Sequence, residues 1–190
     1  SIFLNTASGE MYACTDATTD NNVWTNVGGG TGNVEPWLFG GTVSGYAMGG
    51  HYADGNTDAI VEFSLASFTT ASDIGNLSTG KWNTHGCQSD TRGFCCGGKT
   101  SPSADTDQVD AFPFANPAGG ATVAGSLSVA RHNPSGANSE AYGYMAGGSG
   151  TGNMIDKFSL TSFTTATNIG TLSAGAMSGG HGHSSPTHGF

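Results

Sequence analysis

The sequence predicts an all-β protein of repeated strand-rich units behind a small three-stranded module, and two observations carry this prediction. The first is an internal repeat, because residues 63–71 (FSLASFTTA) return almost letter for letter as 158–166 (FSLTSFTTA), with a more divergent copy at 107–114. The second is the composition, in which 32 glycines and only 10% charged residues leave little helix-forming material. We therefore expect short strands between turns and almost no helix.

A second marker keeps the same period as the first. A glycine, an aromatic residue, two further residues and a Gly-Gly pair occur at 45–50, 93–98 and 143–148, at spacings of 48 and 50 residues (93 − 45 and 143 − 93). Four short strands fit within one such period, which is the make-up of a β-propeller blade. The expected repeats are 45–92, 93–142 and 143–190, about three blades of a larger ring.

Residues 1–30 differ in pattern from the repeats and predict a separate β-meander. Its three strands are expected at 2–4, 11–14 and 23–27, with a turn through Gly9 and a second turn through residues 20–22. Residues 31–44 are expected to be a glycine-rich joint that contains a degenerate strand at 37–41.

The strands of the repeats are predicted from short runs of β-branched and aromatic residues. Each run is flanked on both sides by residues that favour turns. They are expected at 46–48, 60–64, 94–96, 109–112, 144–146 and 155–159, with further pieces at 71–77 and 166–172.

Within these strands an Ile or Val precedes a Phe by three positions. Strict alternation cannot place both on one face, so this spacing predicts a β-bulge or a second buried layer. We expect two sets of equivalent buried positions, namely Phe63, Phe112 and Phe158, and Ile60, Val109 and Ile155.

The charge balance excludes two classes of partner. Five Lys and Arg against 14 Asp and Glu give a net charge of −9, which repels nucleic acids and anionic lipid surfaces. No apolar run approaches the roughly 20 residues that span a bilayer. We therefore predict neither nucleic-acid binding nor membrane insertion.

Ser1 and Phe190 resemble cut points in a longer chain, so we expect further blades or neighbouring subunits to complete the ring.

Residues 45–190 resemble the kelch-repeat family of β-propellers. The order and spacing of six residues carry the resemblance: Arg131, Tyr144, Gly147, Gly148, Ile155 and Phe158. The chain departs from the family at Lys81, where the preceding repeat would have arginine. It also lacks the usual Trp after the third element, with Ile74 and Ile169 nearby instead.

More closely, residues 155–159 and 184–190 resemble degenerate kelch-like repeats in structural proteins of marine bacteriophages. Residues 8–15 and 23–28 are similar to small β modules of phage tail-fibre proteins. These resemblances imply a virion surface protein: a tail fibre, decoration or receptor-binding element. Its implied partners are other virion proteins, further copies of itself, and a host surface glycan or protein receptor. The alternative is a secreted structural or adhesive protein of a bacterial cell surface.

The sequence predicts no catalytic site and no cofactor. It has no GxSxG elbow, and nothing marks one repeat as chemically special. A propeller enzyme is a less favoured alternative, because a copper oxidase uses a kelch-like fold. The Tyr, Cys and His copper ligands of such an enzyme form no recognisable motif here.

The four cysteines Cys14, Cys87, Cys95 and Cys96 lack the paired CxxC spacing of a zinc site. If residues 88–94 turn back as a hairpin, Cys87 faces Cys95 or Cys96, and a disulfide becomes possible. Buried free thiols are an equally good interpretation.

Two further groups raise the question of a metal. His181, His183 and His188 form a His-x-His pair with a third histidine, although the surrounding glycines favour hydrogen-bonded turn histidines. Residues 54, 56 and 58 (Asp, Asn, Asp) alternate as calcium ligands do. They lack the twelve-residue pattern that ends in Glu, so solvated loop side chains are favoured.

Overall fold

The computed structural model describes residues 1–5, 9–27, 43–53, 55–67, 70–150, 153–173, 175, 177–180 and 182. Over these residues the chain is all-β, as predicted, with a single 3-10 turn, η1 (Pro117–Gly119). The described part contains no helix of the length and apolarity needed to cross a membrane. The chain divides into two compact units, Ser1–Phe39 and Gly40–Phe190, and the boundary falls inside the expected joint 31–44.

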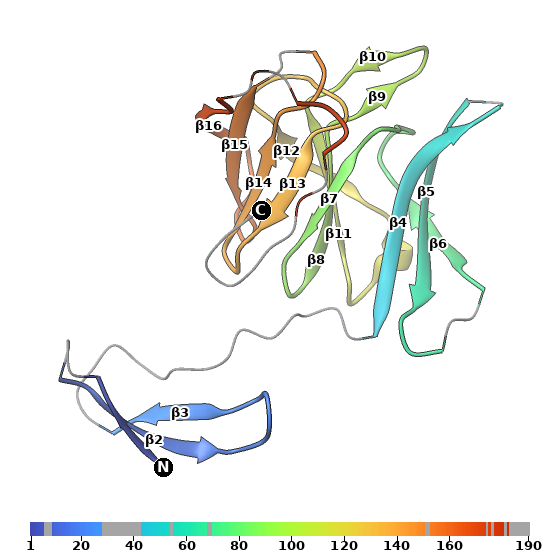
Figure 1. Cartoon of the computed structure of the whole chain (residues 1–190). Helices are drawn as coiled ribbons and strands as arrows, with labels where there is room; N and C mark the ends of the chain where they lie inside the picture. Colours follow the sequence, from blue (N-terminus) through green and yellow to red (C-terminus); the bar gives the residue numbers. More distant parts are fainter. Residues whose placement is uncertain are drawn as a thin grey trace. The chain divides into compact units, whose positions relative to one another are not determined.

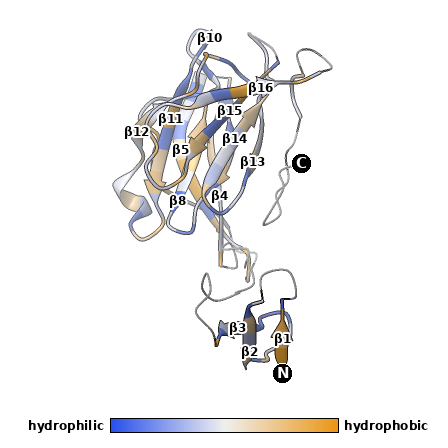
Figure 2. Ribbon diagram, turned by 90° about the vertical axis from the view of Figure 1, so that its left-hand side faces the viewer, coloured by the Kyte–Doolittle hydropathy of each residue, from blue (hydrophilic) through white to orange (hydrophobic). Residues whose placement is uncertain are grey.

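The first unit contains the expected three-stranded meander, β1 (Ile2–Leu4), β2 (Met11–Asp16) and β3 (Val23–Asn26), in the order β1-β2-β3. Its packing is thin. The ring of Phe3 lies 6.2 Å from Tyr12 and 6.3 Å from Trp24, and Tyr12 is buried. The residues of β1, whose ribbon has the hydrophobic colour in Figure 2, all stay exposed.

The second unit contains three antiparallel sheets, in which every strand expected in the repeats is present. Sheet A has β4 (Ser44–Tyr52), β5 (Gly55–Ser64) and β6 (Ser72–Asn76). Sheet B has β7 (His85–Gln88), β8 (Arg92–Cys96), β11 (Gln108–Pro113) and β12 (Thr122–Ser126). Sheet C has β13 (Ser135–Asn138), β14 (Tyr142–Ala146), β15 (Met154–Ser159) and β16 (Thr167–Thr171). A small hairpin, β9 (Lys99–Thr100) and β10 (Ala104–Asp105), extends from sheet B.

The three sheets share one strand order. The sequence β7-β8-β11-β12 of sheet B matches β13-β14-β15-β16 of sheet C, and the order β4-β5-β6 of sheet A matches the last three strands of each. None of the sheets closes on itself over the described residues. Strand β7 lies in the expected repeat 45–92 but pairs with β8 of the next, because a short hairpin joins the two.

The expected β-bulges are present at equivalent places. The register shifts at Ile60/Val61 in sheet A, at Val109/Asp110 in sheet B and at Ile155/Asp156 in sheet C. The second buried layer is present as well, because the two apolar residues of sheet B serve different cores. Phe112 packs toward sheet A and Val109 packs toward sheet C.

Consecutive sheets pack face to face, as Figure 1 shows, with one hydrophobic cluster between sheets A and B and another between B and C. Each phenylalanine ring of the repeat lies on the glycine opposite it in the neighbouring strand. The pairs are Gly45 with Phe63, Gly93 with Phe112 and Gly143 with Phe158. A Cβ on these glycines would come within 2.4, 2.5 and 2.5 Å of the rings. The glycine before each aromatic residue is therefore required by space.

The expected burial is wrong at two of six positions. Phe112 and Phe158 are 1% and 4% exposed, but Phe63 is 39% exposed. Ile60 and Val109 are fully buried, whereas Ile155 is half-buried. The reason is that Phe63 lies on the outer face of sheet A and Ile155 on the outer face of sheet C, and the described residues place no further sheet there.

Candidate functional site

The Gly-Gly pairs position the connections at one end of the three sheets. Their first glycines, Gly49, Gly97 and Gly147, have φ of 67°, 61° and 63°, a conformation that other residues rarely adopt. The N–H of each second glycine donates to a carbonyl in the connection after the last strand of the same sheet. These acceptors are Lys81 at 3.0 Å, Arg131 at 2.9 Å and Met177 at 2.6 Å. The three acceptor residues therefore occupy equivalent positions.

Two of these residues anchor buried ion pairs to the next sheet. Lys81 Nζ lies 3.0 Å from Asp110 Oδ2, and Arg131 Nη2 lies 2.5 Å from Asp156 Oδ2. All four side chains are essentially buried. Lys81 reaches from the end of sheet A to sheet B, and Arg131 reaches from the end of sheet B to sheet C.

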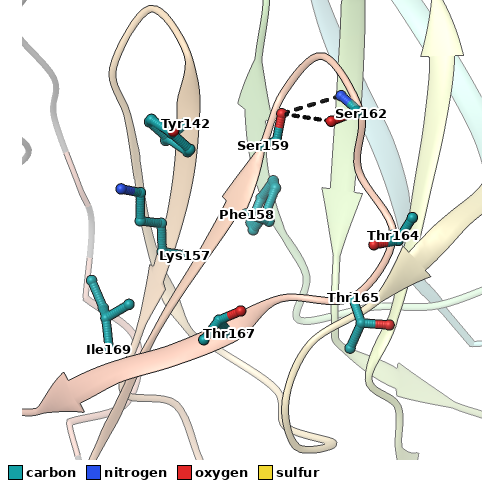
Figure 3. A pocket seen from close by; sticks show the side chains of 9 residues that line it. All are labelled: Tyr142, Lys157, Phe158, Ser159, Ser162, Thr164, Thr165, Thr167 and Ile169. Atoms are coloured by element: carbon teal, nitrogen blue, oxygen red, sulfur yellow. Dashed lines mark hydrogen bonds between the residues drawn. The ribbon is translucent and has the colours of Figure 1, made fainter.

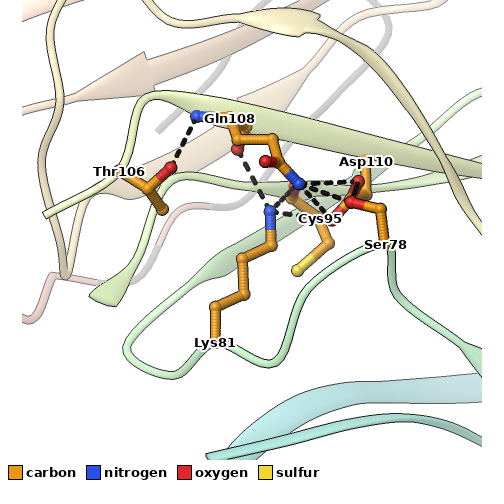
Figure 4. A network of polar contacts seen from close by, with 6 residues as sticks. All are labelled: Ser78, Lys81, Cys95, Thr106, Gln108 and Asp110. Atoms are coloured by element: carbon orange, nitrogen blue, oxygen red, sulfur yellow. Dashed lines mark hydrogen bonds and ion pairs between the residues drawn. The ribbon is translucent and has the colours of Figure 1, made fainter. Parts of the chain in front are cut away.

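Each carboxylate is also held by a serine from the preceding sheet. Ser78 Oγ donates to Asp110 and Ser128 Oγ donates to Asp156, both at 2.6 Å. Figure 4 shows the first network, in which Lys81 Nζ also donates to the carbonyls of Cys95 and Gln108 at 3.2 and 3.1 Å.

The second network contains the same kind of backbone contact. Arg131 donates to the carbonyls of Met145 and Met154, each at 3.3 Å. Burial lowers the pKa of Arg131, and the nearby Asp156 carboxylate opposes that shift. Because these charges are buried and paired across successive sheets, they join one sheet to the next.

A second set of polar and aromatic side chains, most of them half-buried, lies immediately beyond these anchors. We call it the end row, and it has seven members joined through successive contacts: His51, Trp82, Lys99, Asp105, His132, Ser149 and Ser178. Trp82 and Lys99 exchange two backbone hydrogen bonds, at 3.1 and 2.8 Å, and so do His132 and Ser149, at 3.3 and 2.8 Å. These bridges link the connection after one sheet to the residue after the Gly-Gly pair of the next.

Side chains complete the end row. The rings of His51 and Trp82 have centroids 4.8 Å apart. The Asp105 carboxylate accepts from Lys99 Nζ at 3.1 Å and lies 2.9 Å from His132 Nδ1. Ser149 Oγ donates to Ser178 Oγ at 2.9 Å. The row thus runs across the same end of sheets A, B and C, with aromatic surface at one end, charges in the middle and hydroxyls at the other.

The end row varies between repeats, although its framework does not. Two sets of equivalent positions differ from sheet to sheet. The residues after the equivalent acceptors Lys81, Arg131 and Met177 are Trp82, His132 and Ser178. The residues after the three Gly-Gly pairs are His51, Lys99 and Ser149. In both sets the side chain changes from aromatic or charged in sheets A and B to a hydroxyl in sheet C. Sequence reasoning did not identify these residues, because a search for repeats discards positions that differ. The available signal was their place, directly after a Gly-Gly pair or directly after Lys81 and Arg131.

A second feature is a shallow hollow of about 370 Å³ on the outer face of sheet C. Lys157 Nζ lies 3.7 Å from the centre of the Tyr142 ring. In Figure 3 the Lys157 side chain extends between that ring and Ile169. The remaining lining is mostly hydroxyls on the segment after β15, from Ser159, Ser162, Thr164, Thr165 and Thr167.

Cys87, Cys95 and Cys96 lie on the predicted β7–β8 hairpin, whereas Cys14 lies in β2, and all four are free thiols in the structure. Cys87 packs with Cys96 on the sheet C side, whereas Cys95 packs on the sheet A side. Burial raises the pKa of Cys95 to about 11, and burial with a hydrogen bond to Cys87 raises the pKa of Cys96. The hairpin therefore brings Cys87 beside Cys96, and a disulfide between them stays a prediction for oxidised protein.

The histidines His181, His183 and His188 lie outside the described residues, as does Asp54. Asn56 donates to the carbonyl of Lys99 at 3.4 Å, and Asp58 accepts through its backbone carbonyl from the Leu77 N–H. Within the described ranges, no three His, Cys, Asp or Glu side chains gather as a metal site would require.

Comparison with known proteins adds no identification: no family model and no curated protein matches this chain.

Proposed function

We propose that this protein is a non-enzymatic adhesive module that presents the end row to a ligand on a scaffold of kelch-like propeller blades. The observation that carries the proposal is the contrast between a repeated framework and an unrepeated end row. Rigid repeated elements that carry varied residues at one end are a common arrangement for binding surfaces. Support for the blades comes from the shared strand order of the sheets and from the contact between β7 and β13.

The chemistry of the end row suits a carbohydrate. Trp82 and the exposed Tyr52 beside His51 offer ring faces for the apolar faces of sugars. Asp105, held by Lys99 and His132, presents a carboxylate in a fixed orientation to ligand hydroxyls. These groups are paired with one another and not with a reacting centre, so we assign them to binding and not to catalysis.

The proposed setting is the surface of a bacteriophage virion, where the module contacts a host surface glycan or protein receptor together with other virion proteins. A secreted adhesive protein of a bacterial cell surface is the alternative. A net charge of −9 suits a solvated extracellular surface. Immunogold labelling separates the two settings: label on a capsid or tail supports the first, and label on a cell envelope supports the second.

Glycan-array binding of the full chain tests the proposed activity. Asp105→Asn and Tyr52→Ala should each weaken binding about tenfold, the effect of one lost charged hydrogen bond or ring contact. Tyr142→Ala is the matched control, because Tyr142 is an exposed tyrosine that lines the hollow on sheet C, whereas Tyr52 is adjacent to His51 of the end row. Absence of glycan binding, or binding that survives both Asp105→Asn and Tyr52→Ala, would refute this assignment.

A further inference from the structure

The outer faces of sheets A and C carry the residues of an interface. On sheet C, Ile169 and Met177 are each 53% exposed, and on sheet A, Phe63 and Leu65 are each 39% exposed. The strand register assigns each sheet A residue a buried counterpart. Phe63 corresponds to Phe112 and Phe158, and Leu65 corresponds to Leu160. These two faces therefore repeat the pattern of the internal interfaces without being covered by described residues.

The charges give the sharper evidence. At both internal interfaces a cation after one sheet meets an aspartate on the next. On the outer face of sheet C the cation position is held by Met177, whose carbonyl accepts from Gly148 as those of its counterparts accept from Gly50 and Gly98. On the outer face of sheet A the aspartate position is held by Val61, directly after the bulge. Both members of the pair have become apolar together.

This matched change is what a joined pair of faces requires. A charge at either position would be buried without a partner if sheet C met sheet A, which is strongly unfavourable. Methionine against valine avoids that cost and contributes apolar contact. If the two faces were solvated surfaces, neither position would need to be apolar.

The aromatic residues fit the same arrangement. Tyr46 of sheet A lies 5.2 Å from Phe112 of sheet B, and Phe94 of sheet B lies 6.2 Å from Phe158 of sheet C. Tyr144 is the counterpart of Tyr46 and Phe94 in the β14 register, so its expected partner is a phenylalanine at the position of Phe63.

The hollow of Figure 3 also has a counterpart inside the molecule. Its residues Lys157 and Ile169 occupy the positions of Ala111 and Ala124 on sheet B. There the next sheet covers the face with Phe163, which follows β15. By analogy, the hollow is the place where the corresponding segment of a following sheet would lie. In sheet A the strand that corresponds to β15 is β5, and the segment after β5 begins with Leu65.

We propose that the outer face of sheet C docks on the outer face of sheet A in a second copy of this chain. The occupant is a second copy because this one chain carries both complementary faces. Met177 and Tyr144 belong to the face of sheet C, and Val61 and Phe63 belong to the face of sheet A. Such a head-to-tail contact either closes into a ring or continues as an open assembly. The inference does not depend on the ligand of the end row.

Sedimentation equilibrium and native mass spectrometry of the full chain provide the test. The wild type should form assemblies at multiples of 19.1 kDa. Val61→Asp or Met177→Arg alone should weaken association roughly 30-fold or more, because each buries an unpaired charge. The double variant, which recreates the ion pair of the internal interfaces, should return to within about threefold of the wild type.

Two further variants keep the test decisive. Ile169→Lys, at an exposed position of the sheet C face, should weaken association without affecting folding. Val123→Asp is the control. Val123 is an exposed residue of sheet B, and this sheet already packs against sheet A on one face and sheet C on the other. A wild type that is monomeric at every concentration would overturn the proposal. So would single substitutions at Val61 and Met177 without effect, or a double variant no better than either.

Discussion

The glycine before each aromatic residue provides space for a ring. A Cβ at Gly93 would lie 2.5 Å from the ring of Phe112, which is fully buried and has no room to move. Gly93→Ala should therefore lower the free energy of unfolding by about 1–3 kcal/mol through overpacking. Urea denaturation measures the effect. Gly119→Ala is the control, because the nearest heavy atom to its Cβ position lies at 3.4 Å, an ordinary van der Waals contact. Equal stability of both variants would contradict the packing account.

The buried cysteines give a prediction about pH. Because the pKa of Cys95 rises from 9.0 to about 11 in the folded state, the unfolded chain loses this proton first as pH rises. The contribution of this thiol to stability is thus fully present below pH 9 and is lost between pH 9 and about 11. Unfolding free energies measured across that range should fall with pH, and they should fall less in Cys95→Ala. Identical profiles would contradict the assignment.

The same cysteines predict an alkylation pattern. In native protein at pH 8, iodoacetamide should modify Cys14, which is only half-buried, and leave Cys87, Cys95 and Cys96 unmodified. After unfolding without reductant, all four should react if the thiols are free. If oxidised protein forms the Cys87–Cys96 bridge, only two react. Rapid modification of Cys95 in the native state would contradict its burial.

At the scale of strands and sheets, the repeat predicted the elements because each strand carries the same turn and core residues. The Ile–Phe spacing also predicted the bulge correctly. The β9–β10 hairpin was not predicted, since residues 99–105 (KTSPSAD) are polar and lack the aromatic residues that mark the other strands of the repeats. The exposure of Phe63 was missed for a related reason. Repetition shows that positions are equivalent but does not show what covers them.

The ion pairs between sheets were also missed, although their residues are visible in the sequence. Lys81 and Arg131 recur at equivalent places, and Asp110 and Asp156 recur next to the bulge. Their partners lie on different sheets, so only the packing of one sheet on the next brings them together. The end row was missed because its residues differ between repeats and because its contacts join connections of successive sheets.

A substitution pair tests how the ion pair joins sheets A and B. Lys81→Met leaves Asp110 buried without its cation and should cost about 3–5 kcal/mol of stability. The double variant Lys81→Met, Asp110→Val installs the residues that the chain places at Met177 and Val61. It should recover most of that loss, because an apolar pair often replaces a buried ion pair at little cost. Thermal and urea unfolding measure both, and a double variant as unstable as the single one would count against this view.

At the scale of the whole molecule, burial is concentrated in one of the two units. Both hydrophobic clusters belong to Gly40–Phe190. The unit Ser1–Phe39 has one buried aromatic side chain, Tyr12, among its described residues. A three-stranded sheet with so little buried surface is marginally stable by itself. The two units should therefore differ in stability.

Hydrogen exchange of the full chain measures that difference. Backbone amides of β2 (Met11–Asp16) should exchange through low-energy opening, and those of β8 and β11 should exchange only through global unfolding. A gap of about 3 kcal/mol in opening free energy corresponds to more than a hundredfold in exchange rate. Mild denaturant should shift β8 and β11 and leave β2 nearly unchanged, because little surface is exposed when β2 opens. Equal protection of β2 and β11, with equal denaturant dependence, would mean that the two units unfold as one.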